Sequence, residues 1–305
     1  MAERVLDRST APRVYLRAVN LLRCVFLVVT LIAPACGGGT SAPDTVPSAA
    51  SLQVRFKKAI VRVEDVQFAA KYEAELAQHY TTLAPSNGTW FTVLDGSSRV
   101  LVTAGHATAQ TREGQLKPAD GGTGSLAMML NRLTHTTTIH TTYASPSDPN
   151  YYDDNDFKRA VKKLIEERHP RVVLDLHASH PDHPYDVDFG TMEGRSLLGQ
   201  TRLLDSLASR LRDEGLGNFS QDFFGASKNQ TITKWVSGMG VPTIQCEINS
   251  TWLLPAPEVP SSSADAGAST GLNPADEWRN AIQYQRFAEL LEGLLRFVSE
   301  VDAQH

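Results

Sequence analysis

Residues 171–178, which read RVVLDLHA, decide the fold. The stretch opens on a continuous run of apolar residues at 172–174, a pattern that favours a buried β-strand. Because side chains alternate along a strand, Asp175 and His177 share one face and the two leucines share the other. Burying an acid and a histidine at the carboxyl end of a strand costs desolvation free energy, which a metal or an orienting hydrogen bond offsets. The strand therefore predicts either a metal ligand at His177 or a core histidine hydrogen-bonded to Asp175.

Helix and strand patterns alternate on both sides of this strand. The expected strands are residues 89–94, 99–104, 136–143, 171–178 and 241–249, and the expected helices are residues 64–82, 123–133, 156–168, 196–214 and a last helix opening at Asn273-Pro274. The step Asp95-Gly96 indicates a hairpin between the first two strands. Strands that alternate with helices predict an α/β layered domain, in which ligands bind beyond the carboxyl ends of the strands.

The composition excludes several classes of protein. The 305 residues include 29 Lys and Arg against 34 Asp and Glu, a net charge of -5, which is not the balance of a basic nucleic-acid binder. Three cysteines in this length exclude a disulfide scaffold. The hydrophobic share of 41% is ordinary and excludes a polytopic membrane protein.

Residues 1–36 have the plan of a secretory signal. A stretch with five arginines precedes an apolar run that is shorter than the roughly 20 residues of a bilayer span. The run ends in LIAPAC at 31–36, followed by three glycines, and resembles a bacterial lipobox with Cys36 as the lipid attachment site. The alternatives are an ordinary signal peptide, an uncleaved anchor, and an incidental apolar run after a misplaced start codon. We expect an exported protein of the cell envelope that touches the membrane only through this segment.

The rest of the chain divides by composition. Residues 37–52 are rich in Gly, Ser, Ala and Pro and are expected to be a flexible linker. Residues 53–305 are the expected catalytic domain, with a low-complexity loop at 255–272. Without residues 1–36 the chain has 24 basic and 32 acidic residues. The rest of the chain therefore has a net charge of -8, more acidic than the -5 of the whole.

Two other strand ends carry candidate catalytic residues. The strand at 99–104 leads into His106, and Glu113 follows in the loop. The strand at 241–249 places Gln245, Glu247 and Asn249 on the face opposite Cys246, which we interpret as a structural thiol. That polar face is either a solvent face or, under a helix layer, the setting of a buried acid at Glu247, which is typical of a general base.

These residues together match the needs of a zinc hydrolase. Such an enzyme uses three protein ligands, an open position for water and a carboxylate that takes the water's proton. His106, Glu113 and His177 are the candidate ligands and Glu247 is the candidate base. Imidazole and carboxylate donors suit Zn²⁺ better than copper or an iron–sulfur cluster.

The sequence resembles the N-formylglutamate amidohydrolase family, a branch of the zinc-carboxypeptidase-like superfamily. The matching stretches, in the family's order, are GH at 105–106, REG at 112–114, LDLH at 174–177, DFGT at 188–191 and IQCEIN at 244–249. The resemblance implies a single three-layer α/β/α, zinc-exopeptidase-like domain with a mixed, largely parallel sheet of eight strands. It also implies one zinc ion, with His177 as a ligand and Glu247 as the base. Carboxypeptidases of the superfamily keep their first His and Glu three positions apart, whereas seven separate His106 from Glu113, so Asp120 competes for that ligand position.

The expected function is metal-dependent hydrolysis of an amide bond other than an ordinary peptide bond. Glu247 would accept the proton of the attacking water, and the substrate would be a small acylated amino acid or a short peptide. Arg195, by bidentate pairing with a carboxylate, Asn150 and Asp188 are the candidate substrate-binding residues. The alternatives are a carboxypeptidase-like peptidase of the cell envelope, a catalytically inactive ligand-binding lipoprotein and an α/β domain without a site.

Overall fold

The computed structural model describes residues 58–255 and 274–304. The predicted signal at 1–36, the predicted linker at 37–52 and all but the first residue of the predicted loop at 255–272 lie outside the described residues. Within the described ranges, no helix has both the length and the apolar character that crossing a membrane requires.

Helices and strands alternate along the described chain, as the sequence pattern predicts. The helices are α1 (Val63–Ala77), α2 (Thr123–Thr134), α3 (Asp156–Arg168), α4 (Thr201–Asp213), α5 (Ile232–Gly238) and α6 (Pro274–Ala303), with short 3-10 turns at Arg195–Leu197 and Ser250–Trp252. The strands are β1 (Phe91–Leu94), β2 (Val100–Ala104), β3 (Gln110–Arg112), β4 (Gln115–Lys117), β5 (Thr137–Thr141), β6 (Val172–Ser179), β7 (Val187–Gly190), β8 (Phe219–Gln221) and β9 (Thr243–Asn249).

One mixed sheet organises the described residues. Its strand order is β1-β5-β2-β6-β9-β7-β8, and β3 and β4 form a separate hairpin. The central pairs β5–β2, β2–β6 and β6–β9 are parallel, as is the edge pair β7–β8, whereas β1–β5 and β9–β7 are antiparallel. The prediction of a mixed, largely parallel sheet between helices is confirmed. The described residues form seven strands in this sheet, one fewer than the resemblance implies.

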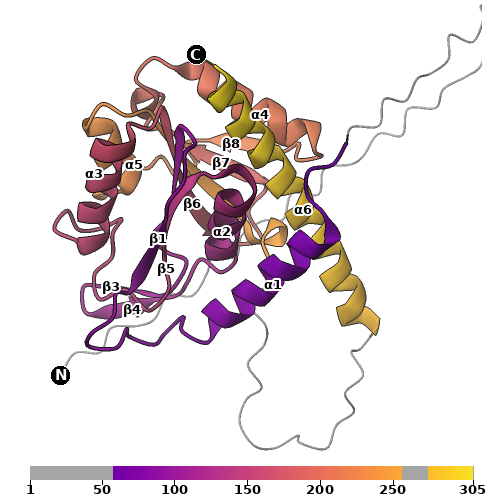
Figure 1. Cartoon of the computed structure of the whole chain (residues 1–305), viewed down its shortest axis with the longest axis horizontal. Coiled ribbons are helices and arrows are strands. Elements are labelled where there is room, and N and C mark those ends of the chain that lie inside the picture. The colour runs from indigo at the N-terminus through magenta and orange to yellow at the C-terminus, as the bar shows by residue number, and fades with distance from the viewer. Residues whose placement is uncertain (1–57, 256–273, 305) are drawn as a thin grey trace, which may run out of the picture. The chain divides into compact units, whose positions relative to one another are not determined.

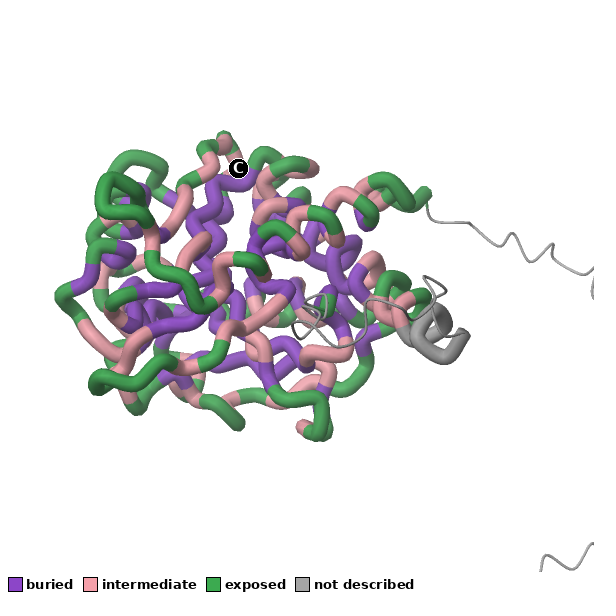
Figure 2. The backbone as a smooth tube through the Cα atoms, turned by 90° about the horizontal axis from the view of Figure 1, so that it is seen from below, coloured by how far each residue is buried: buried purple, intermediate pink, exposed green. Residues whose placement is uncertain are grey.

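The alternation in β6 divides the sheet into two buried faces. Val172, Leu174 and Leu176 join the core that α1, α2, α4 and α6 cover, whereas Val173 joins the core under α3 and α5. Figure 1 shows these two helix layers on opposite sides of the sheet. Figure 2 shows buried segments in the interior and exposed segments around them. Asp175 and His177 follow Val173 onto the α3–α5 face, as the period of two predicts.

Two local predictions are wrong. The step Asp95-Gly96 does not make a hairpin, because β5 lies between β1 and β2 in the sheet. A Cβ on Gly96 would meet the backbone of His135, so the glycine is needed for a close chain approach. The helix expected at 196–214 is broken, because Leu198 and Gly199 adopt left-handed conformations with φ of 51° and 82°, and α4 begins only afterwards.

Candidate metal centre

The carboxyl ends of three central strands bring the candidate residues together. His106 follows the end of β2 by two residues, and His177 and Glu247 lie side by side near the ends of β6 and β9. The turn into His106 passes through Gly105, where a Cβ would lie 2.9 Å from the Pro149 ring. A parallel sheet collects residues that are far apart in the sequence at one edge, which is where its ligands bind.

The start of α2 delivers Asp120 to this edge. The Asp120 backbone N–H donates to the carbonyl of His106 at 2.8 Å. The carboxylate of Glu73, on α1, accepts from the backbone N–H of Gly122 at 2.9 Å and of Ser125 at 3.3 Å, and from the hydroxyl of Tyr80. A fully buried acid at a helix N-terminus satisfies free N–H groups and complements the helix dipole. It thereby fixes the turn that carries Asp120.

Two imidazoles and one carboxylate meet in a group that can hold a metal ion. The Nδ1 atom of His177 lies 2.9 Å from Asp120 Oδ2, and the Nδ1 atom of His106 lies 3.6 Å from the same oxygen. One ligand atom from each of the three residues falls within 4.8 Å of the others. The two rings are edge to face, with centroids 4.8 Å apart. Two nitrogens and one oxygen are a donor set that zinc accepts, and they leave a fourth position for water.

The other nitrogen of each imidazole has a buried polar partner. His106 Nε2 donates to Asp148 Oδ1 at 2.9 Å. His177 Nε2 has the Asn150 amide nitrogen at 3.1 Å as its nearest partner, with Asp175 Oδ2 behind it at 3.5 Å. Both acids are inaccessible to solvent. Metal-binding histidines are held by such carboxylates, which fix the ring orientation and the tautomer. Both Nδ1 atoms are thus left facing Asp120, which is why these residues fit a metal ion.

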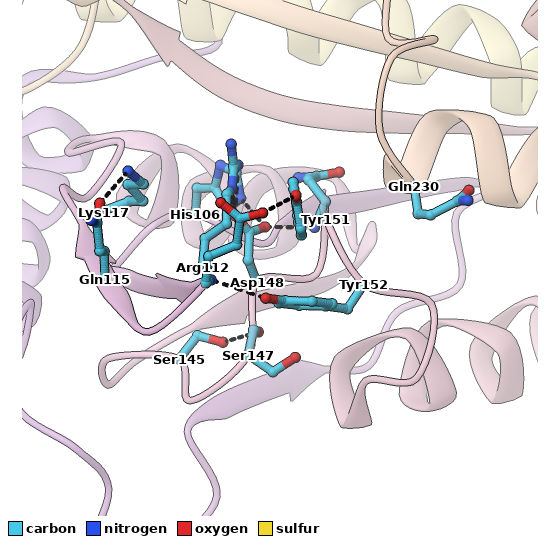
Figure 3. A network of polar contacts seen from close by, with 12 residues as sticks. His106, Arg112, Gln115, Lys117, Ser145, Ser147, Asp148, Tyr151, Tyr152 and Gln230 are labelled. Atoms are coloured by element: carbon cyan, nitrogen blue, oxygen red, sulfur yellow. Dashed lines mark hydrogen bonds and ion pairs between the residues drawn. The ribbon is translucent and has the colours of Figure 1, made fainter.

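Arg112 completes the outer side of the site. Its guanidinium binds Asp148 Oδ2 through Nε at 2.8 Å and Nη2 at 2.6 Å, so it supports His106 through that acid. Figure 3 shows His106, Asp148 and Arg112 close together, with Tyr151 and Tyr152 beside them. The Arg112 guanidinium also lies 5.0 Å from the centre of the Tyr151 ring, a cation–π distance.

The electrostatics of the cluster favour positive charge between these groups. Burial lowers the pKa of His106, but its hydrogen bonds to Asp120 and Asp148 outweigh burial and raise the pKa to about 9. Burial likewise lowers the pKa of His177, and Asp175 and Asp120 outweigh it and raise the pKa well above its usual value. Burial raises the pKa of Asp120, but the two histidines hold it well below its usual range. The negative charges of the three aspartates around the two imidazoles therefore stabilise a cation at this place.

Glu247 lies in the same cavity as the histidines. The cavity has a volume of about 300 Å³ and is lined by His106, Asp120, His177 and Glu247, among others. Burial raises the pKa of Glu247 to about 7, although His177 acts in the opposite direction. The Gln245 amide donates to Glu247 Oε1 at 2.8 Å and orients the carboxylate. On the opposite face of β9, Cys246 is buried, and burial raises the pKa of its thiol.

The structure does not bring Glu113 to the two histidines. Glu113 and Gly114 form the two-residue turn of the β3–β4 hairpin, with φ of 51° and 74°, a turn that projects into solvent. The Glu113 carboxylate accepts from the Tyr151 hydroxyl at 2.6 Å. Asp120, which competes with Glu113 in the sequence, occupies the position beside the histidines.

The three predicted substrate-binding residues are placed differently from one another. Arg195 lies on an exposed turn, paired with Glu193 at 2.7 Å, and is not among the residues that line the cavity. Asn150 lines the cavity, but its carbonyl oxygen accepts from Ile232 N–H and its amide nitrogen lies 3.1 Å from His177 Nε2. Asp188 is fully buried and not in the lining. Asn150 and Asp188 therefore position other parts of the site.

Sequence reasoning did not find Asp148, Arg112 or Gln245 as parts of the site. Gln245 carried a usable signal, since strand alternation places it on the face of Glu247. Asp148 lies in an irregular connection and Arg112 at the end of the separate β3–β4 hairpin, and no periodicity links either of them to His106. Their roles follow only from the folded contacts.

Comparisons with known proteins place similar folds among amidohydrolases and carboxypeptidases. No family model and no curated protein matches the chain. An N-formylglutamate amidohydrolase from Ralstonia eutropha JMP134 has 14% identity and a TM-score of 0.46, covering 69% of this chain and 97% of its own. A bacteriophage poly-gamma-glutamate hydrolase has 17% identity and a TM-score of 0.36, and the match covers 54% of this chain and 73% of the hydrolase. A metallo-carboxypeptidase from Burkholderia cenocepacia has 10% identity and a TM-score of 0.39, covering 69% and 61%.

These structural neighbours include the family and the superfamily that the sequence motifs resemble. Identities and TM-scores this low carry no argument about function, which depends on the site residues of this chain.

Proposed function

We propose that this protein is a zinc-dependent hydrolase of amide bonds in small acylated amino acids or short peptides. The observation that supports it is the shared cavity, where two imidazole Nδ1 atoms and the Asp120 carboxylate converge beside Glu247. His106 is hydrogen-bonded to the buried Asp148, and His177 lies between the Asn150 amide and the buried Asp175, an arrangement typical of metal-binding histidines.

His106, Asp120 and His177 are the residues that would hold the ion. A zinc ion in such a site supplies a Lewis acid that polarises a carbonyl and lowers the pKa of water. The residues around it have separate tasks. Asp148 keeps the His106 imidazole oriented, and Arg112 keeps Asp148 in place. Asn150, with Asp175 behind it, keeps the His177 imidazole oriented.

Glu247 is the proposed general base. Its carboxylate is partly buried and is held at Oε1 by the Gln245 amide, which leaves Oε2 to take a proton from water in the cavity. A carboxylate with a pKa near neutrality can accept that proton and pass it to the leaving amine. A neighbouring cation strengthens this role, because it favours the deprotonated form of Glu247 before reaction.

The test is metal analysis of the purified full chain, followed by a screen of N-acyl amino acids and short peptides. We expect about one zinc ion per chain, and turnover that a chelator removes and added zinc restores. Turnover unaffected by chelation would contradict the proposal. Stoichiometric metal without turnover of any amide would instead favour a binding lipoprotein, and cleavage of peptides alone would favour the peptidase.

We also propose that the protein is exported and lipid-anchored at Cys36. The support is the order of basic stretch, apolar run and Cys-Gly-Gly-Gly in residues 1–39. Mass spectrometry of the mature N-terminus should find a lipid-modified Cys36, and an unmodified Met1 would contradict this prediction.

A further inference from the structure

Two phenyl rings stand exposed at the cavity that holds the candidate metal centre. Phe223 is 58% exposed and Phe224 is 40% exposed, and both line this cavity. They lie in residues 222–226, part of the connection between β8 and α5. Apolar surface left in water costs free energy that burial against a ligand recovers. An adjacent pair of exposed phenyls in a cavity is therefore a candidate apolar binding surface.

Hydrogen bonds fix the backbone of this segment. The buried carboxylate of Asp188 accepts from Phe223 N–H at 3.1 Å and from Phe224 N–H at 2.8 Å. Asp222 and Ala226, at the two ends, have φ of 58° and 55°. Non-glycine residues keep such strained conformations only where the surroundings impose them, and they concentrate at binding sites. The rings are thus held at the cavity.

Aromatic packing behind the two rings makes the surface rigid. His183 stacks on Tyr185 with an interplanar angle of 4°, and both Phe223 and Phe224 meet His183 edge to face, with centroids 5.3 and 5.4 Å away. Phe223 also meets Phe224 edge to face at 5.1 Å. These are the geometries that the quadrupoles of aromatic rings favour. A preorganised surface loses little conformational entropy when it binds a ligand.

A single side chain connects this surface to the proposed base. Gln245 Nε2 donates to Glu247 Oε1 at 2.8 Å and also to the backbone carbonyl of Phe224 at 3.4 Å. The backbone that carries the phenyls is therefore linked to the carboxylate that would act on the amide, and all three side chains line one cavity.

The charges of the cavity indicate how many acidic groups a ligand can carry. Arg112 is neutralised by Asp148. Lys228 also lines the cavity, and no described residue forms a hydrogen bond or ion pair with its ammonium group. Within the described lining, Lys228 is thus the one cation without a carboxylate partner. An acyl-glutamate carries two carboxylates, whereas a cavity lined by one uncompensated cation and two phenyls matches one carboxylate and one apolar group.

We propose that the substrate has one carboxylate and an aromatic or large aliphatic group next to the scissile amide, and that Phe223 and Phe224 select this group over an acidic one. The inference rests on the proposed function and names its substrate class: N-acyl derivatives of apolar amino acids, or of a single amino acid with an aromatic acyl group.

The experiment uses the zinc-loaded full chain and two matched series. One varies the amino acid, with N-acetyl-phenylalanine, N-acetyl-leucine, N-acetylglycine and N-acetylglutamate, and the other compares N-benzoylglycine with N-formylglycine. Both kcat/KM and binding by calorimetry are measured. We expect the apolar member of at least one series to be preferred by on the order of 10-fold to 100-fold. The double variant Phe223→Ala/Phe224→Ala should bring this ratio close to one, and Phe223→Leu/Phe224→Leu should restore part of it.

Ile282→Ala is the matched control, because Ile282 is an equally exposed apolar residue outside this cavity, and it should leave the ratio unchanged. A preference for N-acetylglutamate, or a ratio that survives the double Ala variant, would overturn the inference, while turnover of any of these amides would still support the proposed function. A third outcome is that the wild-type chain binds the apolar ligands selectively but turns none of them over, and that the double variant loses this binding. That result would support the inference and reject the proposed function. If the double variant fails to fold, the single Phe223→Ser variant gives the same ratio test.

Discussion

Replacing Glu247 by Gln is expected to lower amide turnover by about 10²- to 10⁴-fold while the zinc content stays at the wild-type level. Glutamine matches the shape of Glu247 and can still accept the hydrogen bond from the Gln245 amide. It cannot accept a proton from water at neutral pH, so only the proton transfer is removed. The measurements are kcat for the best substrate of the amide screen and metal content by mass spectrometry.

Glu166→Gln is the control for this substitution. Glu166 is an exposed acid on α3, outside the cavity, and its removal should change neither quantity. Turnover near the wild-type level in Glu247→Gln would show that another group takes the proton. Loss of the metal in that variant would instead show that Glu247 helps to hold the ion.

Removing Asp120 is expected to cost the protein its metal, whereas removing Glu113 is not. Asp120 Oδ2 lies 2.9 and 3.6 Å from the two Nδ1 atoms, and Glu113 sits in an exposed hairpin turn. Asp120→Ala should therefore purify with little zinc and no measurable turnover, because two imidazoles alone do not complete a zinc site. Glu113→Ala should keep both the zinc and the turnover. Zinc content after dialysis against a weak chelator is the measurement.

The histidines offer a second matched pair for the same site. His177→Ala should lose the metal, and His180→Ala should keep it, because His180 is an exposed residue three positions beyond His177. Circular dichroism and thermal unfolding of each variant separate metal loss from misfolding. Full zinc content in Asp120→Ala together with loss in Glu113→Ala would reverse the assignment of the ligand.

The sequence-predicted residues that the structure brings to the cavity lie mostly in or next to regular strands. The alternation of β6 and β9 indicates which residues share a face, and this property is local because it depends only on the period of two along each strand. The sequence could therefore place His177 with Asp175, and Glu247 with Gln245, on one face of each strand, whereas the pairing of His177 with Glu247 comes from the structure. The same reasoning predicted Cys246 as a buried residue of the other face. The hairpin prediction at Asp95-Gly96 failed because pairing with β5 is a non-local event.

Residues in connections were decided by the tertiary structure. Glu113 and Asp120 both follow His106 within a short stretch, and the sequence alone gave no reason to prefer the second. The choice depends on two tertiary features. Glu73, which lies on α1, fixes the start of α2 and so the position of Asp120. The β3–β4 hairpin carries Glu113 away from the histidines. Arg195 was assigned to substrate binding from its residue type, but its turn lies outside the cavity lining.

By itself, then, the sequence determined the layered fold, because strand and helix periodicities record which side chains face the core, and it offered the two histidines and Glu247 as candidates from their places at strand ends. Only the tertiary structure decided that Asp120 joins the histidines, that Asp148 and Asp175 back them, and that Phe223 and Phe224 stand at the cavity. These groups meet through contacts between segments far apart in the chain, and such contacts leave no periodic signal in the sequence.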